Sequence, residues 1–240
     1  MKKCRIFLVI FSLVGLSYFA KGANENTSSA LLFPQFEYGY AVQANGNRVR
    51  TSFNYDKVGE HMLFVDIDGT VLKLFANTVS AVIIGDRRFV PRQNDSFYER
   101  VIVGDNAFYI RHRATPVSRG MATGMGTYSS TGAAVAGGIL ALEAALAMRQ
   151  GTRGLFPATV HEFAASERFQ VVDNSAVYLR DGRRSTRVNS LNVLTRRFRP
   201  QRTSGAIDKR PLIEAFAREN NTSFRNVEDV KAIVTYAFSL

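Results

Sequence analysis

The sequence predicts an α+β protein that is mainly β, with an N-terminal antiparallel β-meander followed by a hairpin and short C-terminal helices. Short runs rich in Val, Ile, Phe and Tyr follow one another through residues 36–113, at the spacing of about 8–12 residues that suits a meander. Turn pairs such as Asn45-Gly46 and Asp68-Gly69 separate these runs. Helical periodicity is confined to the chain after residue 113. We therefore expect a sheet that is either curled or closed into a small barrel.

The first 22 residues have the pattern of a secretory signal peptide. Three basic residues precede an uncharged, mostly apolar run of 14 residues at 6–19, and Ala20-Lys21-Gly22 places small residues at the two positions that a signal peptidase recognises. The run is shorter than the ~20 residues that a transmembrane helix needs. The single cysteine, Cys4, lies before the run, so it cannot be the acylated residue of a lipoprotein. We expect export to the periplasm, the outer membrane or the medium, with no transmembrane span in the mature chain.

Residues 23–35 and 36–113 are the next two segments. The first begins with a polar run and is expected to be a flexible leader. His61 and His112 flank runs of the second segment, which predicts surface or edge positions for both imidazoles. The second segment is expected to be the antiparallel β domain, with strands at Tyr38–Gln43, Val49–Tyr55, Met62–Asp66, Val71–Phe75, Val79–Ile84, Arg87–Pro91, Phe97–Val103 and Ala107–His112.

Residues 114–168 differ in composition from the segments on either side. They are rich in Gly, Ala and Ser, which predicts an excursion from the sheet with one short helix at Ile139–Arg149. Contact of the apolar stretch Ala133–Met148 with a membrane is the alternative. We favour the excursion, because the stretch is too short to span a bilayer and carries Glu143.

Residues 169–240 are expected to form a hairpin and three short helices. Asp181-Gly182 is the expected turn, with strand-like runs at Phe169–Val172, Ala176–Leu179 and Arg184–Val188. Apolar residues at helical spacing and capping residues predict helices at Leu191–Phe198 after Ser190, from near Asp208 to Asn220, and from Asn226 onward.

Four motifs are distinctive along the chain, namely Phe53-Asn54-Tyr55-Asp56-Lys57, Ile84-Gly85-Asp86-Arg87-Arg88-Phe89-Val90-Pro91, the hairpin at 178–182 and the helices over 212–230. Together they resemble a family of exported proteins from Bacteroidota-type bacteria. The resemblance covers the β half and the C-terminal end but not the Gly/Ala tract. It implies export and the architecture described above, and it implies no catalytic residue.

Positive charge is concentrated in one part of the chain. The formal charge is +11, and removal of residues 1–22 lowers it to +7, because four basic residues and no acidic residue leave. Residues 180–210 hold ten basic and two acidic residues, a net +8 that exceeds the charge of the whole mature chain. Such a region can attract a polyanion. The candidate anion-binding residues are Arg183, Arg184, Arg187, Arg196, Arg197, Arg199 and Arg202.

The expected partners of this region follow from the compartment. An anionic glycan, lipopolysaccharide or an acidic protein surface is available to an exported protein. Nucleic acid is not expected by default, because single-strand binders interleave stacking aromatic residues and only Phe198 lies within the basic region. A solvated basic face is the alternative, which would leave a purely structural envelope component.

One motif suggests an enzyme. Met62–Val71 resembles the first motif of haloacid-dehalogenase-type phosphatases, in which Asp66 would attack phosphorus and Asp68 would act as acid and base beside Mg²⁺. A helix after residue 72 would favour this alternative, whereas a hairpin there would remove it. With three His in the whole chain and no other catalytic motif, we expect a non-enzymatic binding protein without cofactor or metal.

Overall fold

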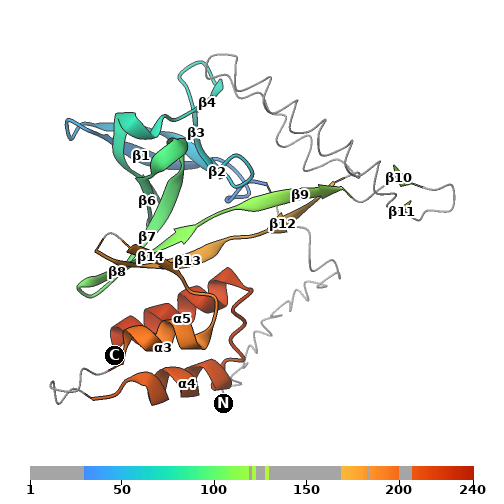
Figure 1. Cartoon of the computed structure of the whole chain (residues 1–240). Helices are drawn as coiled ribbons and strands as arrows, with labels where there is room; N and C mark the ends of the chain where they lie inside the picture. Colours follow the sequence, from blue (N-terminus) through green and yellow to red (C-terminus); the bar gives the residue numbers. More distant parts are fainter. Residues whose placement is uncertain (1–29, 119–120, 123–127, 130–168, 183, 200–206) are drawn as a thin grey trace, which may run out of the picture.

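The fold is described from a computed structural model, in which residues 30–118, 121–122, 128–129, 169–182, 184–199 and 207–240 are placed (Figure 1). The predicted signal peptide at 1–22, residues 23–29 of the predicted leader and the predicted helix at Ile139–Arg149 lie outside these residues. The described part is mainly β, with short helices toward the C-terminus, as the sequence predicts.

Ten strands form the main sheet, and they are β1 (Glu37–Gln43), β2 (Arg48–Asp56), β3 (His61–Val65), β4 (Val71–Lys73), β5 (Val79–Ile84), β6 (Arg87–Pro91), β7 (Phe97–Val103), β8 (Asn106–Arg111), β13 (Ala176–Asp181) and β14 (Arg184–Arg187). Two further pairs join β9 (Ala114–Ser118) to β12 (Phe169–Asp173) and β10 (Met121–Ala122) to β11 (Tyr128–Ser129). The helices are α3 (Leu191–Arg197), α4 (Arg210–Glu219) and α5 (Val227–Ser239), with single 3-10 turns η1 (Ala76–Thr78) and η2 (Gln93–Asp95).

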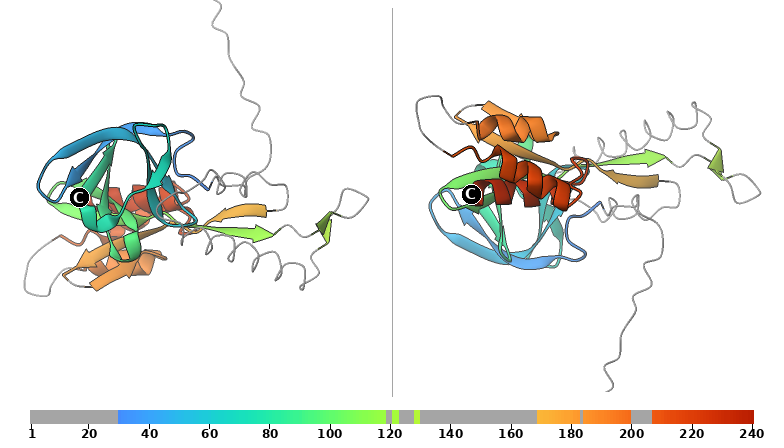
Figure 2. Two further views of the ribbon diagram at one scale, coloured as in Figure 1. Left: turned by 90° about the horizontal axis from the view of Figure 1, so that it is seen from above. Right: turned by 90° about the horizontal axis from the view of Figure 1, so that it is seen from below.

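The main sheet is antiparallel and follows the chain except at two places. Its order is β14-β13-β8-β7-β6-β5-β1-β2-β3-β4, so β1 pairs with both β2 and β5, and β8 pairs with β13. The pairing of β1 with β5 joins a four-stranded unit, β1 to β4, to the meander that starts at β5. Among the described strands the sheet is curled and ends at β4 and β14, so of the two predicted forms it is the curled sheet rather than the closed barrel (Figure 2).

The curled part of the sheet encloses the first hydrophobic core. Phe53 and Tyr55 of β2, Phe89 of β6 and Phe97 of β7 are almost completely buried there. The Tyr55 and Phe89 rings stack with 6.0 Å between their centroids, and the Tyr55 hydroxyl donates a hydrogen bond to the carbonyl of Phe97. Each buried aromatic side chain removes a large apolar area from water, so this core holds β1–β3 against β5–β7.

The three helices cover the other end of the same sheet face and form a second core. Phe108 and Ile110 of β8 and Val177 and Leu179 of β13 pack against Leu194 of α3, Ile213 of α4 and Ile233 of α5. The side chain of Asn226 caps α5 by accepting a hydrogen bond from the Glu228 amide at 2.9 Å, as its sequence predicts. Ser190 stands at the N-cap of α3 but makes no side-chain capping bond.

The predicted flexible leader is ordered from residue 30, which corrects that prediction for 30–35. Ala30, Leu31 and Phe33 are buried against the sheet. Asn54 holds this segment, because its Oδ1 accepts from the Phe33 amide at 3.1 Å and its Nδ2 donates to the Phe33 carbonyl at 3.0 Å. The apolar residues that end the segment are therefore part of the fold.

The segment that was expected to leave the sheet at residue 114 begins with a strand. β9 pairs with β12 to form a ribbon that projects from the body of the molecule (Figures 1 and 2). Its base is fixed to the β2–β3 turn by the ion pair of Lys57 with Asp173, 3.1 Å, and by the small core of Ala30, Ala114 and Val171. β12 therefore pairs with β9, whereas β13 joins the main sheet beside β8.

His112 is buried rather than at the surface, and His61 is buried as well, which corrects both predictions. His112 Nε2 donates to Glu99 Oε2 over 2.7 Å, and Arg87 Nη2 lies 2.5 Å from the same oxygen. Lys231 of α5 approaches Glu99 Oε1 to 3.8 Å. Glu99 lies on β7 between the two cores, so one buried carboxylate links the curled sheet to the helices.

Candidate functional site

The structure distributes the predicted anion-binding arginines over two elements. Arg184 and Arg187 are exposed on β14, which is an edge strand. Arg196 and Arg197 are exposed in the last turn of α3, and Arg199 follows them. The side chains of Arg183 and Arg202 lie outside the described residues.

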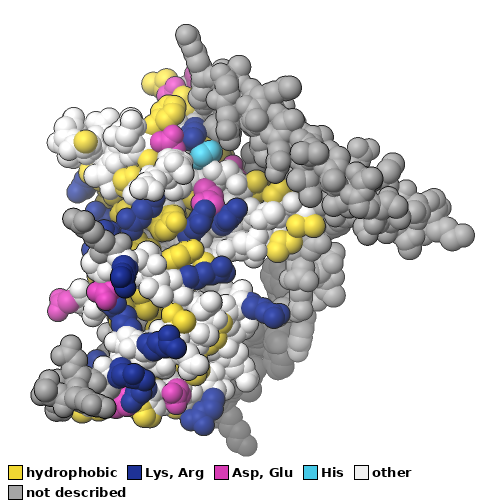
Figure 3. All heavy atoms as spheres, viewed as in Figure 1, with side chains coloured by type: hydrophobic (Ala, Val, Ile, Leu, Met, Phe, Trp, Pro, Cys, Tyr) yellow, Lys and Arg dark blue, Asp and Glu magenta, His cyan; other side chains and the backbone are white. Residues whose placement is uncertain are grey.

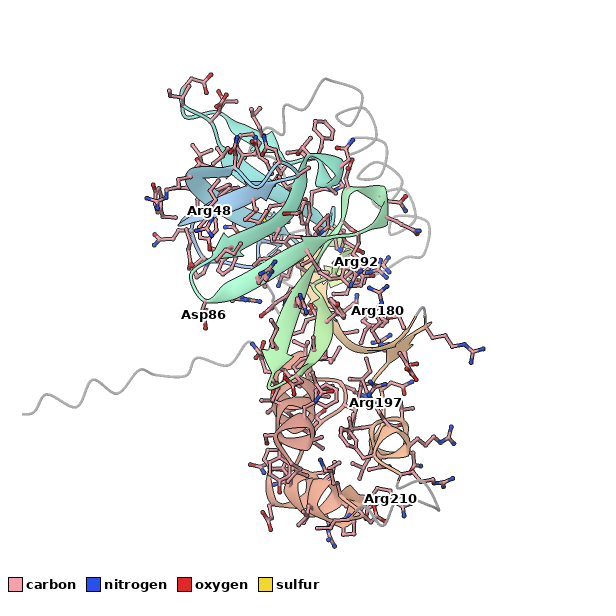
Figure 4. The ribbon with its side chains drawn as sticks, turned by 90° about the vertical axis from the view of Figure 1, so that its left-hand side faces the viewer. Arg48, Asp86, Arg92, Arg180, Arg197 and Arg210 are labelled. Carbon is pink, nitrogen blue, oxygen red and sulfur yellow. The ribbon has the colours of Figure 1, made fainter. Side chains whose placement is uncertain are left out.

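Some of these arginines share one side of the molecule with others from distant parts of the chain. Figure 4 shows Arg92, Arg180, Arg197 and Arg210 one below another along that side, and we call these four the arginine column. Arg210 is neutralised by the Asp208 carboxylate, to which it donates at 2.5–2.9 Å. In Figure 3 the side chains of Lys and Arg outnumber those of Asp and Glu over the middle and lower parts of the visible face.

A cleft of about 800 Å³ lies at the upper end of the arginine column. Five segments form its walls, namely the β2–β3 turn, the β6–β7 loop with the start of β7, β8, β9 with the residue before it, and the β13–β14 hairpin. Its volume is in the range of ligand-binding clefts. The residues that matter for binding are Glu60, Arg92, Tyr98, Tyr109, Arg111, Arg113 and Arg180.

Strand register explains why tyrosine and arginine side chains meet here. Tyr109 of β8 lies opposite Arg100 of β7 on one side and opposite Tyr178 of β13 on the other, and Tyr178 lies opposite Arg187 of β14. Residues at opposite positions of neighbouring strands project from the same sheet face. The row Arg100, Tyr109, Tyr178 and Arg187 therefore lies on the face away from the helices, beside the cleft.

The cleft carries a net positive charge. Its lining holds four arginines and one acidic residue, Glu60, which gives a net +3 among the described residues. Glu60 accepts two hydrogen bonds from Arg111, at 2.8 and 2.7 Å, and lies 3.3 Å from Nε of Arg113. This bidentate pair raises the pKa of Arg111 further, so Arg111 stays charged.

Two of the cleft arginines have no acidic partner among the described residues. Arg180 donates from Nε to the carbonyl of Gly182 at 2.9 Å, and its other donors form no ion pair there. The guanidinium of Arg92 lies over the rings of Tyr109 and Tyr98, 4.4 and 5.4 Å from their centroids. These ring contacts restrict Arg92 without using its donors, so its planar fork is already oriented for an anion.

The tyrosine hydroxyls add uncharged donors to the site. Tyr98 and Tyr178 are in contact, with 6.0 Å between their ring centroids. Burial raises the pKa of Tyr98, and its hydroxyl therefore remains protonated at neutral pH and can donate a hydrogen bond. The arrangement can bind a ligand that carries negative charge together with hydroxyl or carbonyl acceptors.

The structure around Asp66 and Asp68 differs from the one that a phosphatase of this type requires. Strand β4 follows them and pairs antiparallel with β3, so residues 66–70 are a tight hairpin turn. The chain continues from β4 through the single 3-10 turn η1 into β5, with no α-helix in the described residues between the two strands. The Asp66 amide donates to the Thr70 carbonyl at 2.8 Å, and Asp68 Oδ1 accepts from the Thr70 amide at 2.8 Å. Both carboxylates are exposed, and both residues form hydrogen bonds within the turn.

Most residues of the cleft were not predicted from the sequence. Arg92, Tyr98, Tyr109, Arg111 and Arg113 come from the β domain, whose charge is nearly balanced, so no local run identifies them. The sequence contained one signal for these residues. Tyr and Arg occupy every second position at 98 and 100 and again at 109, 111 and 113, and residues two apart project from the same face of a strand.

Comparisons with protein-family models, with curated proteins and with solved structures found no match to this chain. In the part of the chain that the structure describes, no helix is long and apolar enough to cross a membrane. No group of three or more His, Cys, Asp or Glu side chains is placed to hold a metal ion within those same residues.

Proposed function

We propose that this is an exported, non-enzymatic protein that binds an anionic partner on the side formed by the cleft and the arginine column. The observation that carries the proposal is a cleft with net charge +3 in which Arg92 and Arg180 have no acidic partner among the described residues. Further exposed arginines of α3 and β14 extend the positive surface beyond the cleft. The motif of residues 1–22 supports export, and the partners available there are anionic glycans, lipopolysaccharide and acidic protein surfaces.

Binding to such a partner would combine two effects. Exposed arginines attract a polyanion over a distance that salt limits to ~8 Å at physiological ionic strength. The cleft arginines, of which Arg92 and Arg111 are half-buried, provide directional hydrogen bonds to carboxylate or sulfate oxygens. The first effect gives strong salt dependence, and the second gives selectivity.

We expect the substitution of Arg196, Arg197 and Arg199 by Gln to weaken binding to lipopolysaccharide or to an acidic glycan by about tenfold at low salt. Three exposed charges leave, whereas the buried face of α3 is unchanged, so the fold is retained. Affinity is measured by titration at low and at physiological salt. The matched control replaces Arg48, Arg50 and Arg225, three exposed arginines outside the column, and loses the same charge.

Equal affinity of the wild type and the α3 variant, or affinity that salt does not change, would show that these arginines are only a solvated face. A wild type that binds no polyanion would leave the structural envelope component as the remaining interpretation. An equal loss in the control variant would show that only total charge matters and would contradict a local site.

We expect the mature protein recovered from the cell envelope or the medium to begin at or close to Ala23. A signal peptidase recognises the small residues Ala20 and Gly22 after the apolar run. N-terminal sequencing of the purified native protein tests this. An intact Met1 on the protein from the envelope fraction would contradict export by cleavage.

A further inference from the structure

The cleft already contains one bound carboxylate, which comes from the protein itself. Glu60 is held by Arg111 through two hydrogen bonds and by Arg113, and its side chain is only 15% exposed. Glu60 is also one of four described residues other than glycine with positive φ, at 56°. A backbone conformation that is unfavourable for Glu is thus maintained where its carboxylate reaches the cleft arginines.

The two remaining arginines of the cleft have no carboxylate partner among the described residues. Arg92 and Arg180 line the same cleft as Glu60, and neither forms an ion pair there. Arginine binds a carboxylate best through the planar, two-point geometry that Arg111 shows with Glu60. Arg92 can bind a second carboxylate in this way, and Arg180, whose Nε donates to the Gly182 carbonyl, can bind one through its two Nη atoms.

We propose that the cleft recognises a carboxylated sugar unit, with its carboxylate on Arg92 and Arg180 and its hydroxyls toward Tyr98 and Tyr109. The inference rests on the proposed function and specifies its ligand. Such units occur in soluble acidic glycans and in the sugar part of lipopolysaccharide. The cleft volume of about 800 Å³ is large enough for a short segment of a sugar chain.

The tyrosines favour a sugar over a nucleic-acid base. Proteins that bind single strands present aromatic faces on which bases stack. Here the Arg92 guanidinium covers a face of both the Tyr109 and the Tyr98 ring, and Tyr98 also contacts Tyr178. A ligand therefore meets guanidinium groups and hydroxyls, which match the carboxylate and hydroxyls of an acidic sugar.

Glu60 acts in this proposal as an internal competitor. Its carboxylate neutralises Arg111 and Arg113, which reduces the field that an incoming anion experiences. Replacing Glu60 by Gln keeps the size of the side chain and an acceptor oxygen but raises the net charge of the cleft lining from +3 to +4. The change should strengthen binding of a carboxylated ligand.

The test uses the full mature chain and a galacturonate oligomer, with titration calorimetry at physiological salt. We expect Arg92→Gln and Arg180→Gln each to weaken affinity by about tenfold, because each loses a charge-assisted bidentate bond. We expect Glu60→Gln to strengthen it several-fold. Arg88→Gln, an exposed arginine on β6 that is absent from the lining, is the control and should have little effect.

Three further ligands are compared with the galacturonate oligomer. The methyl-esterified galacturonate oligomer has the same sugars without charge, and we expect no binding. A dextran sulfate oligomer and a single-stranded oligonucleotide of equal charge should bind more weakly and should lose less affinity on Arg92→Gln than the galacturonate oligomer does. If the galacturonate oligomer displaces lipopolysaccharide from the wild type, soluble acidic glycans and lipopolysaccharide both bind in this cleft.

Equal affinity for the galacturonate oligomer, the dextran sulfate oligomer and the oligonucleotide, with no effect of Arg92→Gln on any of them, would overturn this inference. The proposed function would remain. Preferential binding of the oligonucleotide would replace the sugar by nucleic acid. Absence of binding to any polyanion would instead remove the proposed function itself. A gain of affinity in Glu60→Gln that accompanies a loss in Arg92→Gln supports the inference, because a destabilised fold would weaken binding in both variants.

Discussion

Replacing Glu99 by Ala is expected to lower the free energy of unfolding by about 3–5 kcal/mol, the cost of leaving buried charges without their partner. Glu99 is 3% exposed, and its carboxylate binds Arg87 and His112 inside the sheet and faces Lys231 of α5. Without it, Arg87 and Lys231 lose an anion and His112 loses its acceptor. The loss is a large fraction of the total stability of an ordinary domain.

The same residue makes stability depend on pH. Burial opposes ionisation of Glu99, but hydrogen bonds from His112 and Arg87 prevail and lower its pKa from 4.5 to about 2. A carboxyl group with a lowered pKa in the folded state contributes stability that is present above pH 4.5 and is lost as the pH falls toward 2. We expect the wild type to lose about 3 kcal/mol from this group over that window.

Urea denaturation at pH 7 and pH 3 measures both effects. Glu99→Gln keeps the shape of the side chain and removes the titrating group. The difference in the free energy of unfolding between wild type and this variant should therefore shrink as the pH falls. Titrating groups that do not contact Glu99 cancel in that difference, whereas His112, which bonds to Glu99, does not. Glu219→Ala, an exposed glutamate near the end of α4, is the control and should change stability by less than ~0.5 kcal/mol. An equal loss of stability in Glu219→Ala would contradict the role assigned to Glu99.

The second large effect is expected from Gly39→Ala, at about 3 kcal/mol. Gly39 lies on β1 opposite Ile84 of β5, and a Cβ atom at this position would stand 2.3 Å from the carbonyl oxygen of Ile83. That oxygen belongs to the backbone, so the clash can be relieved only by moving one strand away from the other. Strands β1 and β5 make the pairing that joins the two parts of the sheet, so we expect the whole fold to lose stability.

Gly46→Ala is the matched control, because it lies in the β1–β2 turn with φ +86° and no atom within 4 Å of the added Cβ. The change there introduces backbone strain alone, with an expected cost of about 1–2 kcal/mol. Denaturation midpoints of both variants, with amide hydrogen exchange along β1 and β5, make the comparison. If Gly39→Ala were no more destabilising than Gly46→Ala, the close approach of the two strands would be contradicted.

Most strands follow from local sequence. Asn45-Gly46, Asp68-Gly69 and Asp181-Gly182 each form a turn in which the glycine has positive φ, and short hydrophobic runs on either side become the paired strands. The interpretation of Asp68-Gly69 as a turn, with Asp66 at the end of the preceding strand, could also be made from context. Hairpins are local structures, so a sequence window of about ten residues contains the information that specifies them.

The leader and the histidines could not be predicted in this way. Phe33 is held by Asn54, 21 residues away, and His112 is buried because Glu99 and Arg87 lie on two other strands. A polar side chain next to a strand is normally exposed, and only a partner brought by the fold makes its burial favourable.

The sequence by itself determined most strand segments of the main sheet with their turns, the three C-terminal helices, the basic character of residues 180–210 and the expectation of export. Only the tertiary structure decided that β1 pairs with β5, that β13 joins β8, and that Arg92, Tyr109 and Arg180 line one cleft. Local patterns set which residues share a face of one strand, with a period of two. Which strands become neighbours depends on contacts between residues far apart in the chain, and the cleft, built from five such segments, exists only once those contacts have formed.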